Sequence, residues 1–72
     1  MAACIKTIND ARYDYYTFSI DDARDIQDLP TMNTPGKGKL SNVKKACQGS
    51  WAEGTDGSIY TLEGKTNTWI EY

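Results

Sequence analysis

Apolar and polar residues alternate over short stretches near the start of the chain. "CIKTI" alternates weakly and predicts a short strand or an extended arm. "RYDYYTFSI" at residues 12–20 is rich in aromatic and β-branched side chains, which favour a pleated, half-buried surface. One face of that strand would carry Tyr16, Phe18 and Ile20, and the other Tyr13, Tyr15 and Thr17. Because an uncovered aromatic surface tends to associate with other surfaces, Tyr13 and Tyr15 are candidate interface residues.

The apolar spacing changes to a helical one after this strand. Ser19 and Asp22 match the positions of a capping box, so Ser19 is the expected N-cap of a short helix over residues 21–29. Pro30 forbids its continuation. The apolar side of this helix would be formed by Ile20, Ala23 and Ile26.

Turn-forming residues dominate the next stretch. "PTMNTPGKGKLSN" at residues 30–42 contains two prolines and two glycines, and predicts a long exposed loop that we extend to residue 48. A phosphate-binding interpretation of "GKGKLS" fails, because the P-loop pattern requires Gly-Lys followed by Ser or Thr and a glycine five positions earlier.

The strongest strand signals lie in residues 49–72. "GSWAEG", "IYTL" and "TWIEY" predict three strands, joined by turns at "TDGS" and "EGKTN". Asp56-Gly57 is typical of a type I′ hairpin turn. Trp51, Tyr60 and Trp69 fall one per strand, and we expect them to pack in the core rather than to form a ligand platform. The register that decides whether they share a face is not specified by this pattern.

These elements predict one small domain, mainly β with one short helix (α+β). It consists of a lead-in strand at 1–20, a helix at 21–29, a loop at 30–48 and an antiparallel meander at 49–72. A chain of 72 residues buries only about 60% of its unfolded surface. The thin core favours association with other subunits, so we expect a homo-oligomer.

Charge is distributed unevenly along the chain. Residues 10–28 contain six aspartates and two arginines, whereas residues 37–45 contain four lysines and no acid. These segments are either two solvated faces or complementary patches that meet between copies or on a larger partner. The candidate interface cations are Lys37, Lys39, Lys44 and Lys45. A net charge of −2 and the lack of aromatics among these lysines argue against nucleic-acid binding.

Catalytic and metal-binding chemistry is poorly represented. The chain has no histidine and no CxxC pair, so a zinc site lacks ligands, and the aspartates do not follow the order of a calcium loop. Cys4 and Cys47 could form one bridge, but free buried thiols are favoured. We therefore predict no enzyme, no cofactor and no metal. No apolar run approaches a membrane span, and the N-terminus does not resemble a signal peptide.

A combination of motifs resembles a segment found in structural proteins of tailed bacteriophages, including head-fibre, capsid-decoration and receptor-binding tail proteins. It comprises "DIQDLPT", a Gly-rich stretch, and "GSWAEGTDGSIYTLEGKTNTWIEY", and it spans about residues 15–72. The matching positions are Asp28, Leu29, Pro30, Thr31, Gly49, Ser50, Asp56, Gly57, Ile59, Tyr60 and Trp69. The expected motif and packing residues are Leu29, Pro30, Trp51, Asp56, Gly57, Ile59, Tyr60 and Trp69. Glu53 and the pair Lys44-Lys45 depart from the pattern and leave the attachment surface open.

This resemblance implies a virion structural protein, of capsid-decoration or head-fibre type, that binds the outer capsid surface. The implied partners are the phage major capsid protein or other virion proteins, and the implied location is the virion, assembled in the host cytoplasm. Because no shaft or receptor-binding domain follows Tyr72, we expect a compact module. The alternatives are a tail or baseplate adaptor and a host-directed phage protein that is absent from the virion.

Overall fold

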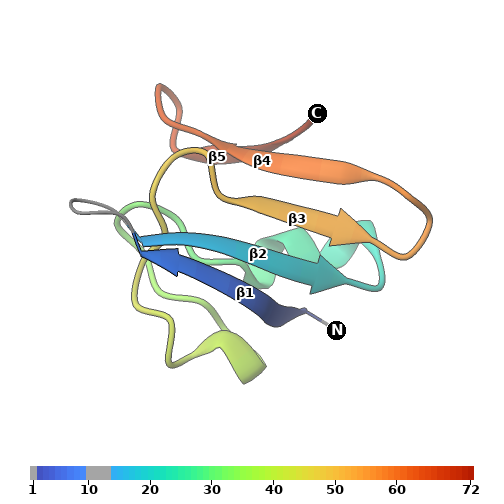
Figure 1. The fold of residues 1–72 in the computed structure, drawn as a ribbon, viewed down its shortest axis with the longest axis horizontal. Helices are drawn as coiled ribbons and strands as arrows, with labels where there is room; N and C mark the ends of the chain where they lie inside the picture. Colours follow the sequence, from blue (N-terminus) through green and yellow to red (C-terminus); the bar gives the residue numbers. More distant parts are fainter. Residues whose placement is uncertain (1, 10–13) are drawn as a thin grey trace.

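A computed structural model describes residues 2–9 and 14–72 of the chain. Its main feature is one mixed five-stranded sheet with the spatial order β1-β2-β3-β4-β5 (Figure 1). The strands are β1 (Ala3–Asn9), β2 (Asp14–Ile20), β3 (Trp51–Gly54), β4 (Ile59–Glu63) and β5 (Thr68–Glu71). The predicted mainly β fold class is confirmed.

The N-terminal segment forms a strand that pairs antiparallel with β2. The register shifts between Cys4 and Lys6, which marks a β-bulge at the outer edge of the sheet. On β2 the predicted alternation holds on the core side, where Phe18 and Ile20 are buried and Tyr16 is half-buried. The rings of Tyr16 and Phe18 stack with their centroids 5.7 Å apart. The aromatic strand therefore pairs within the domain.

The C-terminal half forms the predicted antiparallel meander β3-β4-β5. The pairing that joins it to the N-terminal hairpin was not predicted. β2 and β3 run parallel, with Phe18 opposite Ala52, and both side chains are fully buried. Parallel neighbours require a long crossover connection, and residues 21–50 supply it.

The crossover begins with a 3-10 helix, η1 (Ala23–Asp28), in place of the predicted helix capped by Ser19. Asp22 is the N-cap and forms the capping box with Asp25, so the box lies three residues later than predicted. Ala23 is exposed instead of facing the core. Leu29 ends the helix in an extended conformation, because the following Pro30 disfavours helical geometry at the residue before it.

The segment predicted to be an exposed loop is instead a layer of the core. It contains a second 3-10 helix, η2 (Gly38–Leu40), and the side chains of Leu40, Val43 and Ala46 are buried. In Figure 1 η1 lies behind β2 and β3, and the chain then runs to η2, which is drawn below β1. Its few apolar residues are separated by polar ones without a regular period, so the sequence pattern concealed their burial.

The two turns of the meander lie where the sequence predicted them, but the first has a different type. A type I′ turn needs a positive φ at both central residues. Gly57 has a φ of +90°, whereas the only positive φ at a non-glycine residue among residues 2–9 and 14–72 is that of Asn67. The hydrogen bond from Gly57 N–H to the Gly54 carbonyl closes the turn, and Asp56 Oδ1 accepts a further one from Ser58 N–H.

Within residues 2–9 and 14–72, the sheet is covered on one face only. The crossover packs against the side of Phe18 and Ala52, and Tyr60 and Trp69 are partly buried on this core side. Trp51 points to the opposite side and is 49% exposed, so its predicted place in the core is wrong. The register explains this outcome, because Trp51 precedes the buried Ala52 and successive side chains of a strand alternate between faces.

Candidate interaction surfaces

The uncovered side of the sheet, here called the open face, is a row of side chains in register. Trp51 on β3 lies opposite Thr61 on β4, and Thr61 lies opposite Ile70 on β5. Thr17 continues the row onto β2. The open face comprises Ala3, Lys6, Ile8, Tyr15, Thr17, Ser19, Trp51, Glu53, Ile59, Thr61, Glu63, Thr68 and Ile70.

Several large apolar side chains of the open face are accessible to solvent. The exposed fractions are 50% for Ile8, 49% for Trp51, 43% for Ile59 and 39% for Ile70. Isolated exposed apolar residues are ordinary, but a group on one flat face is typical of an interaction surface. Sequence reasoning placed Ile59 among packing residues, and the structure places it on this face.

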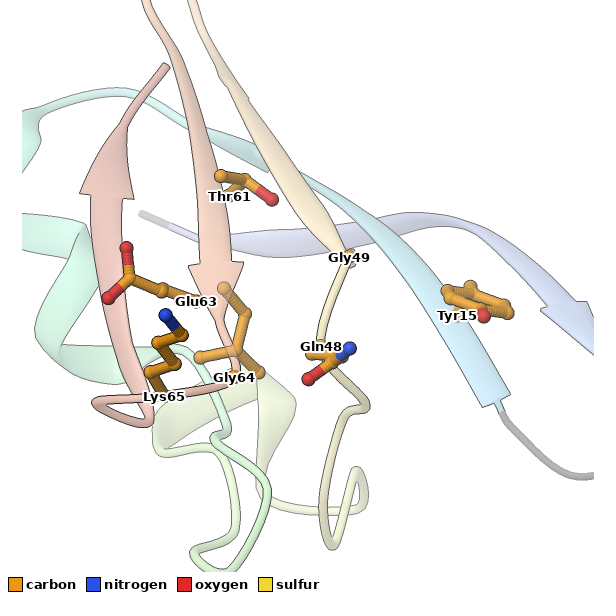
Figure 2. A pocket seen from close by; sticks show the side chains of 8 residues that line it. Tyr15, Gln48, Gly49, Thr61, Glu63, Gly64 and Lys65 are labelled. Atoms are coloured by element: carbon orange, nitrogen blue, oxygen red, sulfur yellow. The ribbon is translucent and has the colours of Figure 1, made fainter.

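A groove of about 850 Å³ opens on the same face where β3 begins. Figure 2 shows Tyr15 of β2 on one side, Glu63 and Lys65 on the other, and Gln48 and Gly49 between them. The groove is lined by Tyr15, Gln48, Gly49, Thr61, Leu62, Glu63, Gly64 and Lys65. It is therefore continuous with the row of Trp51 through Thr61.

The Gly-Ser pair before β3 explains the shape of the groove. Gly49 has a φ of +93°, and a Cβ at this position would lie 3.3 Å from the Tyr15 ring. Ser50 is buried, and its hydroxyl oxygen accepts a hydrogen bond from Tyr16 N–H at 3.1 Å. The chain thus passes close to Tyr15 at Gly49. The Ser50 side chain then binds β2 just before the backbone pairing of β2 with β3 begins.

The Asp-Leu-Pro-Thr step anchors the crossover and takes no part in the open face. Leu29 and Pro30 are buried. The Pro30 carbonyl accepts a hydrogen bond from Trp69 Nε1 at 2.9 Å. The Trp69 ring also meets Phe18 edge to face, with the centroids 5.9 Å apart. These residues hold the crossover against the core.

Asn67 is a structural residue that the sequence analysis did not identify. Its Oδ1 accepts a hydrogen bond from Met32 N–H at 2.8 Å, and its Nδ2 donates one to Asn33 Oδ1 at 2.8 Å. The backbone of Asn67 has a φ of +54°, a conformation that asparagine tolerates better than most residues. The Asn before the last predicted strand was the available signal, and it indicated a turn but not a contact with the crossover.

The four candidate lysines lie on the crossover, away from the open face. Lys37, Lys39, Lys44 and Lys45 are all exposed, and we call residues 37–45 the basic loop. Tyr15, which was grouped with them by sequence, lines the groove instead. Tyr13 lies outside the described residues. The structure therefore does not bring the predicted interface residues into one surface.

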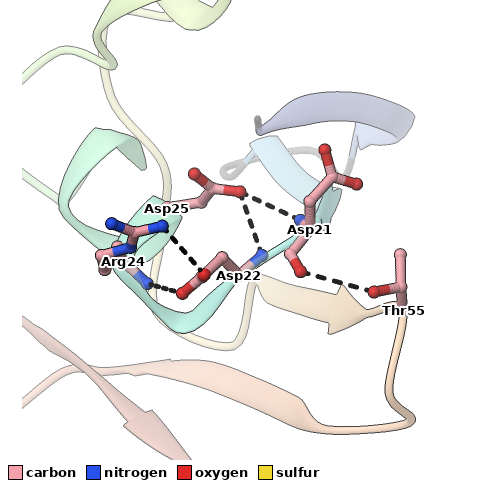
Figure 3. A network of polar contacts seen from close by, with 5 residues as sticks. All are labelled: Asp21, Asp22, Arg24, Asp25 and Thr55. Atoms are coloured by element: carbon pink, nitrogen blue, oxygen red, sulfur yellow. Dashed lines mark hydrogen bonds and ion pairs between the residues drawn. The ribbon is translucent and has the colours of Figure 1, made fainter.

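The aspartates after β2 form a local network of polar contacts (Figure 3). Asp25 Oδ2 accepts hydrogen bonds from the N–H groups of Asp21 and Asp22 at 3.0 and 3.2 Å, and Asp22 Oδ2 lies 3.2 Å from Arg24 Nη2. The backbone N–H of Arg24 lowers the pKa of Asp22, with further contributions from the Arg24 side chain. The Thr55 hydroxyl reaches the Asp21 carbonyl at 3.4 Å and links this network to the β3-β4 turn.

Further predictions concern the cysteines, metal ligands and membrane-spanning helices of the described part of the chain. No disulfide joins Cys4 and Cys47. Cys4 is exposed and Cys47 is half-buried, so the predicted burial of Cys4 is wrong. No group of three or more potential ligands gathers into a metal site among residues 2–9 and 14–72. Likewise, no described helix has the length and apolar character to span a membrane.

Comparison of the chain with protein-family models, with curated proteins and with solved structures returned no match.

Proposed function

We propose that the chain is a non-catalytic structural protein of a tailed-bacteriophage particle that binds the outer surface of the capsid. The resemblance of the sequence motifs to structural proteins of tailed bacteriophages is the reason for proposing a phage particle as the partner. The observation that carries the proposal is the basic loop, in which four exposed lysines are held on a fixed backbone with no acid between them. Such a surface fits an acidic patch on a larger protein.

The backbone of the basic loop is anchored at both ends. Lys37 N–H donates to the Asp28 carbonyl at 2.9 Å, and the preceding Gly36 N–H donates to the Val43 carbonyl at 2.9 Å. Ala46 N–H donates to the Thr31 carbonyl at 2.9 Å. The loop therefore needs little ordering when it binds, which lowers the entropic cost of association.

Buried apolar side chains fix the same loop from below. Leu40 and Val43 belong to the core cluster that contains Phe18. The lysines are thus presented by a segment that cannot move without disturbing the core. Because the crossover covers the face opposite the open face, binding through the lysines would leave Trp51 and its neighbours free for another contact.

Titration of particles that lack the protein tests this proposal. Purified protein should bind such particles to saturation, as measured by co-sedimentation. Reversing two charges in Lys44→Glu/Lys45→Glu should weaken binding about tenfold, because each exposed pair contributes roughly 0.2–1 kcal/mol and reversal adds repulsion. Added salt should also weaken binding of the parent protein.

The matched control is Lys44→Arg/Lys45→Arg, which keeps both charges and should bind like the parent. Equal affinity of the glutamate and arginine variants would contradict the role of the basic loop. Mass spectrometry of purified virions tests the location: absence of the protein from virions would contradict the proposal and favour a host-directed role. A map of the virion with the protein at the tail would favour an adaptor.

A further inference from the structure

We propose that two copies of this chain associate through their open faces and form a two-layer sandwich, with Trp51 of each copy in the groove of the other. This interaction uses the side of the sheet opposite the basic loop. It therefore goes beyond the proposed binding to the capsid and does not depend on it. The proposal rests on the shape, area and charge of the open face.

The apolar side chains of the open face need a cover of similar character. On the core side of the sheet, the crossover buries Phe18, Ile20 and Leu62 almost completely. On the open face, no segment within residues 2–9 and 14–72 covers Trp51, Ile59 and Ile70 in the same way. Two antiparallel sheets commonly bury such faces against each other, with their strands aligned to within about 30°.

The area of the face suits a dimer. The Cα atoms of the whole domain extend over 32 × 24 × 19 Å, so its broad side, which includes the open face and the loops around it, spans about 32 × 24 Å, or about 770 Å². Standard stable interfaces bury about 800 Å² on each partner. A second copy of the sheet matches the open face in extent, whereas a short peptide would leave much of it exposed.

The face contains both a projection and a hollow, as a self-complementary surface requires. Gln48 and Gly49, which line the groove, precede Trp51 by only two or three residues, or about 7–10 Å along an extended chain. Consider a twofold axis that lies midway between the two sheets and passes over β3, between Trp51 and the groove. Rotation about this axis places Trp51 of one copy over the groove of the other. Trp51 of each copy then enters the other groove beside Tyr15 and Thr61.

The charges on this side do not oppose the pairing of two identical faces. Among residues 2–9 and 14–72, the face and its groove carry two cations and two anions, namely Lys6, Lys65, Glu53 and Glu63. Their sum is zero, so two copies approach without net repulsion between these surfaces. The basic loop, by contrast, would repel its own copy, which favours contact through the open face.

The test is sedimentation velocity of the full chain at protein concentrations from 1 µM to about 1 mM. The expected result for the parent protein is a rise from the 8.0 kDa chain mass to twice that value. Trp51→Lys should remain a monomer throughout. Gln48→Trp, which fills the groove from its own chain, should raise the dimer dissociation constant at least tenfold.

The control variant is Ser41→Lys, which adds the same charge to an exposed site on the crossover and should dimerise like the parent. Thermal unfolding at 1 µM checks that each variant is folded. A parent protein that stays monomeric at about 1 mM overturns the proposal, as does a Trp51→Lys protein that still dimerises. A monomeric parent whose binding to particles is lost in Trp51→Lys would assign the open face to the capsid instead.

Discussion

The two tryptophans of this chain have opposite roles because of their positions in the strands. Trp69 faces the core side, where its ring meets Phe18 and its N–H group satisfies the Pro30 carbonyl. Trp51 lies on the open face and is half exposed. Burial of a large ring with a satisfied polar group stabilises a small domain strongly, whereas exposure of a ring on a flat face provides a contact for a partner.

Trp69→Phe should lower the free energy of unfolding by about 1 kcal/mol, because it removes the hydrogen bond to Pro30 and keeps most of the ring packing. Trp69→Ala should lower it by about 3 kcal/mol or more, because the contact with Phe18 is lost as well. Urea unfolding of dilute protein measures both values. The control is Trp51→Ala, which should change stability by less than about 1 kcal/mol in the monomer. Equal effects of the two alanine variants would contradict the assigned faces.

At the scale of elements, polar contacts determine where the short segments begin and end. The strand β2 is followed directly by the 3-10 helix because Asp22 and Asp25 satisfy N–H groups that have no partner within the helix. The β3-β4 turn uses Asp56 in a similar way. These carboxylates accept hydrogen bonds more strongly when they are ionised than when they are protonated. The ends of these elements should therefore be sensitive to acid.

Stability should therefore fall in acid. The backbone N–H of Arg24 holds the pKa of Asp22 below its ordinary value of 3.8, and the backbone N–H of Ser58 does the same for Asp56. Since the folded pKa is the lower one, the stabilisation is fully present above about pH 4 and is lost as the pH falls through the folded pKa.

Melting temperatures between pH 2 and 6 measure this effect. Asp22→Asn and Asp56→Asn keep a hydrogen-bond acceptor without the charge, and together they should flatten the decrease below pH 4. The carboxyl groups of Asp22 and Asp56 are both exposed. High salt should therefore alter the pH dependence of the melting temperature only by screening their charges. An unchanged acid limb in the double variant would show that other groups control the pH dependence.

At the scale of the whole molecule, the domain has two layers, a sheet and a crossover that contains little regular structure. The crossover supplies Leu29, Leu40 and Val43 to the core cluster, so the core exists only when residues far apart in the chain have come together. A domain of this size has little stability in excess. Losing one contact between the layers should therefore affect the entire fold.

Leu40→Ala should lower the free energy of unfolding by about 2–5 kcal/mol, because it opens a cavity between the crossover and the sheet. This is a large part of the roughly 5 kcal/mol expected for a small domain. Circular dichroism during thermal unfolding measures the loss. Lys39→Ala, at the exposed neighbouring position, is the control and should change little. A Leu40→Ala protein as stable as the parent would contradict the role of the crossover as a core layer.

Much of the secondary structure followed from local patterns. The aromatic alternation in β2, the three strands of the meander and the position of the Asp56-Gly57 turn depend on neighbouring residues, and all of them occur in the structure. The cap of the short helix was placed three residues too early, because both Ser19 and Asp22 satisfy the capping pattern. The pattern cannot show that Ser19 is already committed to β2 through its pairing with Ala3.

The sequence by itself determined that the chain forms several short strands with a polar, breaker-rich segment between them. Only the tertiary structure decided that β2 pairs parallel with β3, that Leu40 and Val43 close the core, and that Trp51 stays on the open face. The physical reason is that alternation assigns side chains to two faces of a strand but does not say which face will be covered. That choice depends on contacts between distant segments, whose free energy no local pattern contains.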